Sequence, residues 1–378
     1  MANVAATLRA LLLQPNEIAS RTRLKPERVQ EILDGSQVAA SELRALARGL
    51  KLSMRDFTSA GSPAANQKFG TRFRSPGVAS VEREPTLDRL AGFVDAALKV
   101  LPARERLPDW LNEFGLQGQE SYDEAERLAS ELRAFIYPGE MDSPAIDLPQ
   151  RLRKLDGLIV SQLKNSKYEG ASVAAGGYLF VFVSPRFPAR MLFTLGHELG
   201  HVVAHHSLQS VHLDLATNIG TFRNRSESFA DAFSSAFLLP PQTVGATLQA
   251  VREAIRATSD EIGDVEILIL ARMYGVSFDV AARRCEALDL LPSGGAVSLA
   301  EYLRQHHKNP EKRAEALKLP PRQAVHFDAV SPILMKFVHQ SVASGETSPS
   351  WIADRLGMSI ESIYSTHAST GERRASTH

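Results

Sequence analysis

The sequence predicts an α+β fold that is mostly helical, with one small sheet in the middle of the chain. Three observations lead to this prediction. Short apolar repeats with helical spacing fill residues 1–58, the runs Leu158–Val160 and Tyr178–Val183 have the composition of buried strands, and amphipathic helical repeats occupy most of the remaining chain. Strands followed by helices, instead of alternating with them, are typical of α+β organisation.

These patterns divide the chain into four parts. Each boundary is a change in apolar periodicity or a stretch rich in proline, glycine and serine. The parts are an all-α helix-turn-helix domain (1–58), a linker with one helix (59–100), a central α+β domain with the small sheet (101–291), and a helical C-terminal region with a disordered tail (292–378).

Composition excludes several classes of protein. The chain has 378 residues, 44% of them hydrophobic, which is ordinary for a globular protein of two or three domains. No apolar run approaches the ~18–20 residues of a membrane span, and the first residues lack a signal-peptide layout. Cys285 is the single cysteine, which excludes an internal disulfide and a cysteine-based zinc ribbon. We therefore expect a cytoplasmic protein without a membrane partner.

The apolar spacing of the N-terminal part predicts four short helices. The first covers Val4–Leu13, and Asn16 can cap the second. A third begins at Pro26 and ends before Gly35, and Ser41 can cap a fourth. A short helix, a turn and a second short helix form a helix-turn-helix arrangement.

The segments Asn16-Glu-Ile-Ala, Ile32-Leu-Asp-Gly35 and Leu43-Arg-Ala-Leu-Ala-Arg-Gly-Leu50 resemble the lambda-repressor-like (XRE) DNA-binding domain. The resemblance covers nearly all of residues 3–58. It implies that the third helix enters the major groove of DNA.

On that helix, Arg28 and Gln30 would read base edges, and Lys25 would reach a phosphate. Glu27 and Glu31 would repel the DNA backbone. The alternative is therefore a module of the same fold that docks a protein or forms a dimer.

Residues 59–85 read as a basic linker, because prolines and glycines interrupt any apolar repeat. Thr86–Leu98 is the predicted helix of this part. Its single apolar face could pack on the next domain or bring two chains together, so a homodimer is among the expected partners.

The central part begins with helices and continues with strands. Ser121 and Glu124 form a capping-box pattern for a helix that ends at Phe135, and Leu148–Leu155 is a second helix. Leu158–Val160 is a predicted strand, and Tyr178–Val183 is a predicted buried strand. Between them, residues 170–177 read as a turn or bulge region that can close a hairpin.

The motif His197-Glu-Leu-Gly-His201 lies in the next predicted helix. Side chains four residues apart share one helix face, so both imidazoles can bind one ion, with Glu198 beside its open coordination position. A zinc peptidase needs this arrangement, because the carboxylate can take a proton from a metal-bound water. Gly196 and Gly200 each cost about 1 kcal/mol relative to alanine, which indicates close packing of another backbone.

A third ligand candidate follows in an amphipathic helix. Phe229, Phe233 and Phe237 form its apolar stripe, and Glu227 and Asp231 fall on the opposite side. Two aligned carboxylates fit one ligand and one acid that orients a ligand. The pattern of the metzincins is absent, because Ala204 and Ser207 stand where it needs glycine and histidine.

Several spaced motifs resemble the ImmA/IrrE family of zinc metallo-endopeptidases. They include Arg190–His201, Glu227–Phe233 followed by Leu238-Leu-Pro240, and Leu270–Ser277. The resemblance covers about 170 residues and implies a gluzincin-like site, in which His197, His201 and Glu227 bind Zn²⁺. Glu198 is then the general base, and Asp231 supports a ligand. Ser184 departs from the asparagine that relatives often carry, a difference that affects substrate contacts.

Other residues near the motif have weaker assignments. Tyr178 is a candidate oxyanion donor, and the edge of the strand Tyr178–Val183 could pair with an extended substrate. Arg190 reads as an ordinary surface or ion-pair residue. We leave three histidines outside the ligand set: His205, His206 and His212. In the C-terminal part we expect two short helices in 296–330, a helix at Ser331–Val342 and a second helix-turn-helix pattern at Ser350–Tyr364.

Three functions remain open from the sequence. The first is a site-specific zinc endopeptidase that regulates transcription by cutting a repressor in response to stress, with a DNA-binding head. The second is a DNA-binding repressor or antitoxin whose metal site is structural or sensory. The third is a scaffold whose N-terminal helices dock a partner repressor.

Overall fold

The computed structural model describes residues 4–5, 8, 15–49, 85–166, 168–205, 211–215 and 225–364. The chain divides into two compact units, Met1–Lys99 and Val100–His378. Most of the predicted first helix, the linker before Pro85, His206 and the tail after Tyr364 lie outside the described residues.

The first unit contains α2 (Pro15–Thr22), α3 (Pro26–Leu33), α4 (Ala40–Gly49) and α6 (Pro85–Val100). The helices of residues 15–49 enclose a small apolar core that includes Ile18, Val29, Ile32 and Leu46. Gly35 follows α3 with φ = 100°, a conformation that favours glycine, so the predicted end of α3 is confirmed.

The predicted start of α4 is wrong by two residues. The helix already includes Ala40, and Ser41 lies within its first turn. The carboxylate of Glu42 instead accepts a hydrogen bond of 2.8 Å from the backbone N–H of Ala39. An acidic side chain in the first turn therefore binds the backbone N–H of the residue before the helix, as the glutamate of a capping box does.

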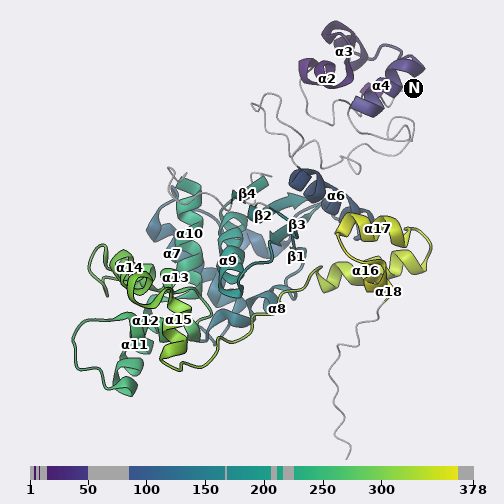
Figure 1. The fold of residues 1–378 in the computed structure, drawn as a ribbon. Coiled ribbons are helices and arrows are strands. Elements are labelled where there is room, and N and C mark those ends of the chain that lie inside the picture. Colours follow the sequence, from purple (N-terminus) through teal and green to yellow (C-terminus); the bar gives the residue numbers. More distant parts are fainter. Residues whose placement is uncertain are drawn as a thin grey trace, which may run out of the picture. The chain divides into compact units, whose positions relative to one another are not determined.

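The second unit is α+β and mostly helical, as predicted (Figure 1). Its elements are, in order, η3 (Asp109–Glu113), α7 (Tyr122–Ile136), η4 (Ala145–Asp147), α8 (Leu148–Leu152), β1 (Leu158–Gln162), β2 (Tyr168–Ala175), β3 (Tyr178–Val183), α9 (Pro188–His205), β4 (Val211–Leu215), α10 (Arg225–Leu238), α11 (Pro241–Ile255), α12 (Asp264–Met273), α13 (Phe278–Ala287), α14 (Gly295–His307), α15 (Pro310–Ala316), α16 (Pro332–Ala343), α17 (Pro349–Leu356) and α18 (Ile360–Tyr364).

The sheet has the strand order β1-β3-β2-β4. β3 runs parallel to β1 and antiparallel to β2, and β2 also pairs antiparallel with β4. All six residues of β3 are buried, as a central strand requires. The predicted free edge of Tyr178–Val183 is therefore wrong, because both sides of this strand pair with neighbours.

Residues 170–177 are mainly strand, and the predicted turn region is correct only at its end. Gly176 and Gly177 form the turn between β2 and β3, with φ values of 55° and 78°. Small residues such as those at 170–175 have low strand propensity, but pairing with strands on both sides overrides it. A bulge lies just before the predicted region, because the pairing with β4 shifts register between Tyr168 and Gly170.

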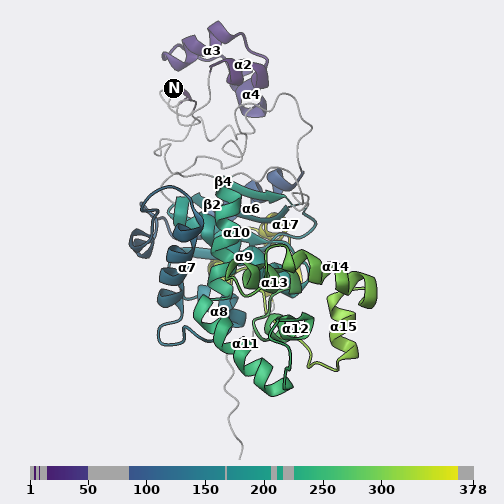
Figure 2. The ribbon, with the colours of Figure 1, turned by 90° about the vertical axis from the view of Figure 1, so that its left-hand side faces the viewer.

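Helix α9 packs on β2 and β3 of the sheet, α10 packs side by side with α9, and α7 packs on α10 (Figures 1 and 2). The predicted close approach is confirmed. A Cβ on Gly196 would lie 3.4 Å from the Cα of Ser234, and one on Gly200 would lie 3.2 Å from the Cβ of Phe233.

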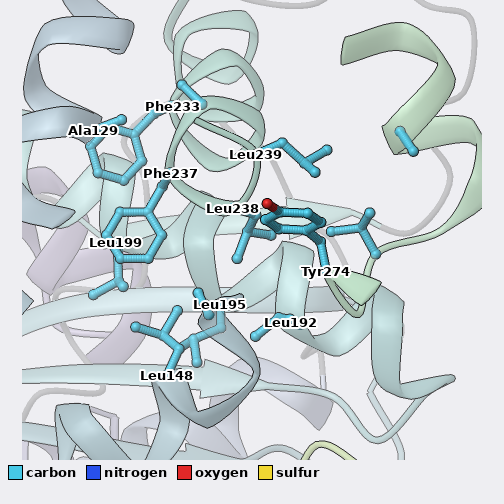
Figure 3. Packing of buried hydrophobic residues seen from close by; sticks show 14 of the residues in the cluster. Ala129, Leu148, Leu192, Leu195, Leu199, Phe233, Phe237, Leu238, Leu239 and Tyr274 are labelled. Carbon is cyan, nitrogen blue, oxygen red and sulfur yellow. The ribbon is translucent and has the colours of Figure 1, made fainter. Parts of the chain in front are cut away.

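The apolar stripe of α10 faces the main core. Phe233 and Phe237 stack at 6.2 Å between ring centroids and lie among residues of α7 and α9, including Ala129 and Leu199 (Figure 3). This burial fixes the rotation of α10. Its opposite face, with Glu227 and Asp231, is thereby turned to the polar side of α9.

The helices α14 and α15 contribute Ala296, Leu303 and Ala314 to the same core. An extended segment then runs along β1 toward α16. Gln162 donates its backbone N–H to the carbonyl oxygen of Ala329 at 3.0 Å and its side-chain N–H to that of Phe327 at 3.0 Å. After α16, Gly357 (φ = 64°) makes the turn between α17 and α18, in the predicted helix-turn-helix pattern.

Two predicted helices differ in detail. Ser121 caps α7 by accepting from the N–H of Glu124 at 3.2 Å, but Glu124 accepts from Gln117 and not from the cap residue. α8 ends at Leu152, three residues earlier than predicted, and is preceded by a 3₁₀ turn.

Candidate metal centre

Three predicted ligands from two helices converge on one point. His197 and His201 lie on successive turns of α9, and Glu227 lies in the first turn of α10. The Nε2 atoms of the two histidines are 3.1 Å apart. The Glu227 oxygens lie 3.3 Å from Nε2 of His197 and 3.5 Å from Nε2 of His201. The imidazoles are buried, whereas the Glu227 side chain is 26% exposed.

These distances fit the geometry of a metal site. Zinc binds nitrogen and oxygen ligands at ~2.0–2.2 Å, so ligand atoms at the corners of a tetrahedron around it are separated by roughly 3.3 Å. The three observed separations lie on either side of this value. Two neutral imidazoles and one carboxylate are also a ligand set that suits zinc. This group could therefore hold a divalent metal ion.

Glu227 is held in its charged form. Burial by itself would raise its pKa, but hydrogen bonds and charge interactions with His197 and His201 lower that pKa well below the usual range of a glutamate. The carboxylate is therefore a ready anionic ligand at neutral pH.

Asp231 lies behind one ligand. Its Oδ1 is 2.9 Å from Nδ1 of His197, on the side of the ring that faces away from His201 and Glu227. A carboxylate can only accept, so Nδ1 of His197 carries a proton. Loss of the Nε2 proton, which bonds to Glu227 in the metal-free protein, would leave the Nε2 lone pair directed at the common point. The ring cannot rotate without losing the hydrogen bond to Asp231.

Ser226 stands in a similar position behind His201, with Oγ 3.4 Å from Nδ1. Sequence reasoning missed this residue. The available signal was its position beside Glu227 in the first turn of α10, which brings a small hydroxyl to the same side as the ligands.

Glu198 is fully buried between α9 and β2. A Cβ on Gly170 would collide with its Oε1 and would also lie 2.7 Å from Cγ2 of Thr194. Glycine at this position is thus required by the close approach of the strand to the Glu198 carboxylate. Gly170, which was expected to lie in a turn or bulge region, is thus a packing surface for the predicted base.

Tyr178 is not an oxyanion donor, and this prediction is wrong. Its hydroxyl donates to the carbonyl oxygen of Pro102 at 2.9 Å. It lies at the end of β3 that pairs with Ala175, whereas Gly170 beside Glu198 pairs with the opposite end.

The other assigned residues near the motif are placed as follows. Ser184 is buried, and its hydroxyl donates to the carbonyl oxygen of Tyr168 at 2.6 Å. Arg190 forms the predicted ion pair, with Nε 2.8 Å from Oε2 of Glu169. The side chains of His205 and His212 lie outside the described residues.

The candidate DNA-reading residues of α3 contact the protein itself. Arg28 binds Glu42 at 2.8 Å, Glu31 at 2.6 Å and the carbonyl oxygen of Gln37 at 2.7 Å. The hydrogen bonds from Arg28, together with that from the backbone N–H of Ala39, lower the pKa of Glu42 to about 2. The amide of Gln30 donates to Asp34 at 3.1 Å.

Lys25 is exposed at the start of α3. Gln30 is exposed as well, whereas Arg28 is half-buried. The role of all three residues in binding DNA stays a prediction.

A comparison with protein families identifies the segment that carries the metal centre. Residues 158–286 match the model of the IrrE N-terminal-like domain (Peptidase_M78). The matched segment begins at β1 and ends in α13, so it contains the sheet and both helices of the His–His–Glu group. It supports the ImmA/IrrE resemblance and indicates a metallopeptidase-type function. A search of curated proteins found no match.

Among the described helices, none combines the length and the apolar character needed to cross a bilayer.

Proposed function

We propose that this chain is a zinc-dependent, site-specific endopeptidase that regulates transcription by cleaving a repressor protein. The observation that carries the peptidase part is the convergence of His197, His201 and Glu227, at the separations of a tetrahedral metal site, beside a buried glutamate that immediately follows the first ligand.

A metal ion held by these three residues would polarise a water molecule and a peptide carbonyl group. Glu198 would accept the proton of that water and pass it to the leaving amine. Glu198 is fully buried, so its carboxylate is shielded from bulk solvent. This shielding favours its role as the base that accepts the proton. Asp231 holds His197 in the tautomer that ligation requires.

Access to the group lies on the α10 side. His197, Glu198 and His201 are buried, whereas the side chains of Glu227 and Asp231 are 26% and 24% exposed. A substrate would therefore reach the group past the first turns of α10. β3 pairs with a neighbouring strand on each side, so an extended substrate would have to bind another surface.

The test is cleavage of a proteome-derived peptide library by the zinc-loaded full chain, read by mass spectrometry. We expect cleavage at a narrow set of sites, its loss with a chelator, and a loss of at least ~10³-fold in Glu198→Gln with zinc still bound. Glu286→Gln on α13 is a control with cleavage close to wild type. Equal cleavage by Glu198→Gln and wild type would overturn the proposal.

The regulatory part rests on the two sequence resemblances. Incubation of the zinc-loaded chain with purified repressor-type proteins, with and without chelator, tests it directly. Cleavage of general peptides without cleavage of any repressor would support a peptidase but reject this substrate class.

The internal pairing of Arg28 favours a second candidate for the N-terminal helices, namely docking of the partner repressor instead of DNA. The two candidates differ in salt dependence. DNA binding should weaken steeply between 50 mM and 200 mM salt, whereas protein docking over an apolar and hydrogen-bonded surface should change much less.

A further inference from the structure

The helix α9 presents more than its metal ligands. Arg190, Thr194 and Glu198 are spaced by four residues and so lie along one face of the helix. All three contact the first half of β2. Arg190 binds Glu169, and the side chains of Thr194 and Glu198 meet Gly170.

The contacted part of β2 is a bulge. Tyr168 pairs with Leu215 and Gly170 with Asp214, so Glu169 is the extra residue between two paired positions. A bulge changes the direction of a strand, and here it brings the backbone of Gly170 against the Glu198 carboxylate.

Three contacts hold the bulge in place. Arg190 forms a two-point ion pair with Glu169, whose side chain is only 12% exposed. The backbone N–H of Ser184 donates to the carbonyl oxygen of Glu169 at 2.7 Å. The hydroxyl of Ser184 donates to the backbone carbonyl oxygen of Tyr168 at 2.6 Å. Each contact comes from α9 or from the residue that follows β3.

We propose that the β2 bulge fixes the position of the Glu198 carboxylate, and that Glu169 and Arg190 are positioning residues for the base. The inference rests on the proposed function. Arg190 lies at one end of the α9 face and Glu198 at the other. Because Glu169 and Gly170 are adjacent, the Arg190–Glu169 ion pair sets the position of the Gly170 backbone beside Glu198. Without the pair, the bulge can shift along β4, and the surface that confines Glu198 moves.

The test compares Arg190→Gln and Glu169→Gln with the charge-swapped double variant Glu169→Arg/Arg190→Glu, all in the full chain. Arg104→Gln is the matched control. It breaks another two-point ion pair, with Asp156, beside the turn at the other end of β2 and β3.

Two readouts are needed. Hydrogen exchange followed by mass spectrometry reports the opening of residues 168–175 in metal-free protein. Steady-state cleavage of the fastest library peptide reports kcat and KM, and zinc affinity is measured by competition with a chromophoric chelator.

We expect both single variants to speed exchange in residues 168–175 and to lower kcat by ~10- to 100-fold, with KM and zinc affinity within about twofold of wild type. The charge-swapped variant should recover much of the wild-type protection against exchange and much of the wild-type kcat. A purely structural role would lower zinc affinity or stability in parallel with kcat.

The proposal is overturned if exchange and kcat of the single variants match those of Arg104→Gln, or if kcat falls without faster exchange. If the zinc-loaded wild type cleaves nothing, the proposed function fails. The exchange comparison then still decides whether the ion pair holds the bulge.

Discussion

Charged groups are arranged in opposite ways in helix α3 and in the candidate metal centre. In α3 the cation Arg28 lies between the carboxylates of Glu31 and Glu42, within 2.6 Å and 2.8 Å. Between α9 and α10, two imidazole nitrogens and the Glu227 carboxylate face one another at 3.1–3.5 Å. The first group already contains its positive charge. The second directs lone pairs and negative charge at a point that a metal ion suits.

This difference teaches how to distinguish a binding group from a structural one. Both clusters stand out in the sequence as charged residues with helical spacing. What separates them is whether the opposite charge is supplied by the chain itself. We therefore expect the metal centre to respond strongly to an added ion and α3 to respond mainly to loss of its own partner.

The largest effect is expected from the ligands. Zinc added at 1,000 times its dissociation constant should stabilise the folded chain by about 4 kcal/mol, and His201→Ala should abolish this gain. Calorimetric unfolding of the metal-free and zinc-loaded protein measures it. His306→Ala, an exposed histidine on α14, should keep the full gain. If zinc stabilised His201→Ala and His306→Ala equally, His201 would have no part in zinc binding, and the contrast between the candidate metal centre and α3 would be lost.

A smaller effect is expected behind the ligands. Asp231→Asn keeps an acceptor for the N–H of His197 but loses the charge that makes the imidazole a strong ligand. Zinc affinity should fall by ~10- to 100-fold, measured by competition with a chelator. Asp123→Asn, an exposed carboxylate on α7, serves as the comparison. An unchanged affinity would show that the Asp231 charge has no part in binding.

The smallest effect is expected in α3. Hydrogen bonds from Arg28 and from the backbone N–H of Ala39 lower the pKa of Glu42 to about 2 from the ordinary value of 4.5. The contribution to stability is then complete above about pH 4.5 and is lost as the pH falls from there toward 2. Because the pair is exposed, the contribution is small.

Hydrogen exchange of residues 26–49, corrected for the intrinsic rate, should become faster between pH 5 and pH 3 in wild type. In Arg28→Gln it should already be faster at pH 5 and should change less on acidification. An identical pH response in both proteins would mean that Arg28 does not stabilise α3 against acid.

The helices of the site could be predicted because their information is local. The spacing of His197 and His201 and the phenylalanine stripe of α10 follow helical geometry, and burial of that stripe turns Glu227 and Asp231 toward α9. The spacing of Gly196 and Gly200 similarly indicated the close approach of a second helix.

The sheet could not be predicted to the same depth, because strand neighbours are set by distant segments. β3 lies in the interior since β1 pairs with it on one side and β2 on the other. Nothing within Tyr178–Val183 distinguishes a central strand from an edge strand that is covered by helices. The role of Gly170 likewise depends on Glu198, which lies 28 residues further along the chain.

The extended segment beside β1 has a practical consequence for dividing the chain. Gln162 hydrogen-bonds to both Phe327 and Ala329, and Gln150 bonds to the carbonyl oxygen of His326 at 2.9 Å. A fragment that stops at Lys318 would retain every metal ligand but would uncover the outer side of a strand, a surface that promotes association between chains. The shortest fragment that contains the candidate metal ligands and stays free of such association should therefore extend past Ser331, well beyond the last of these ligands.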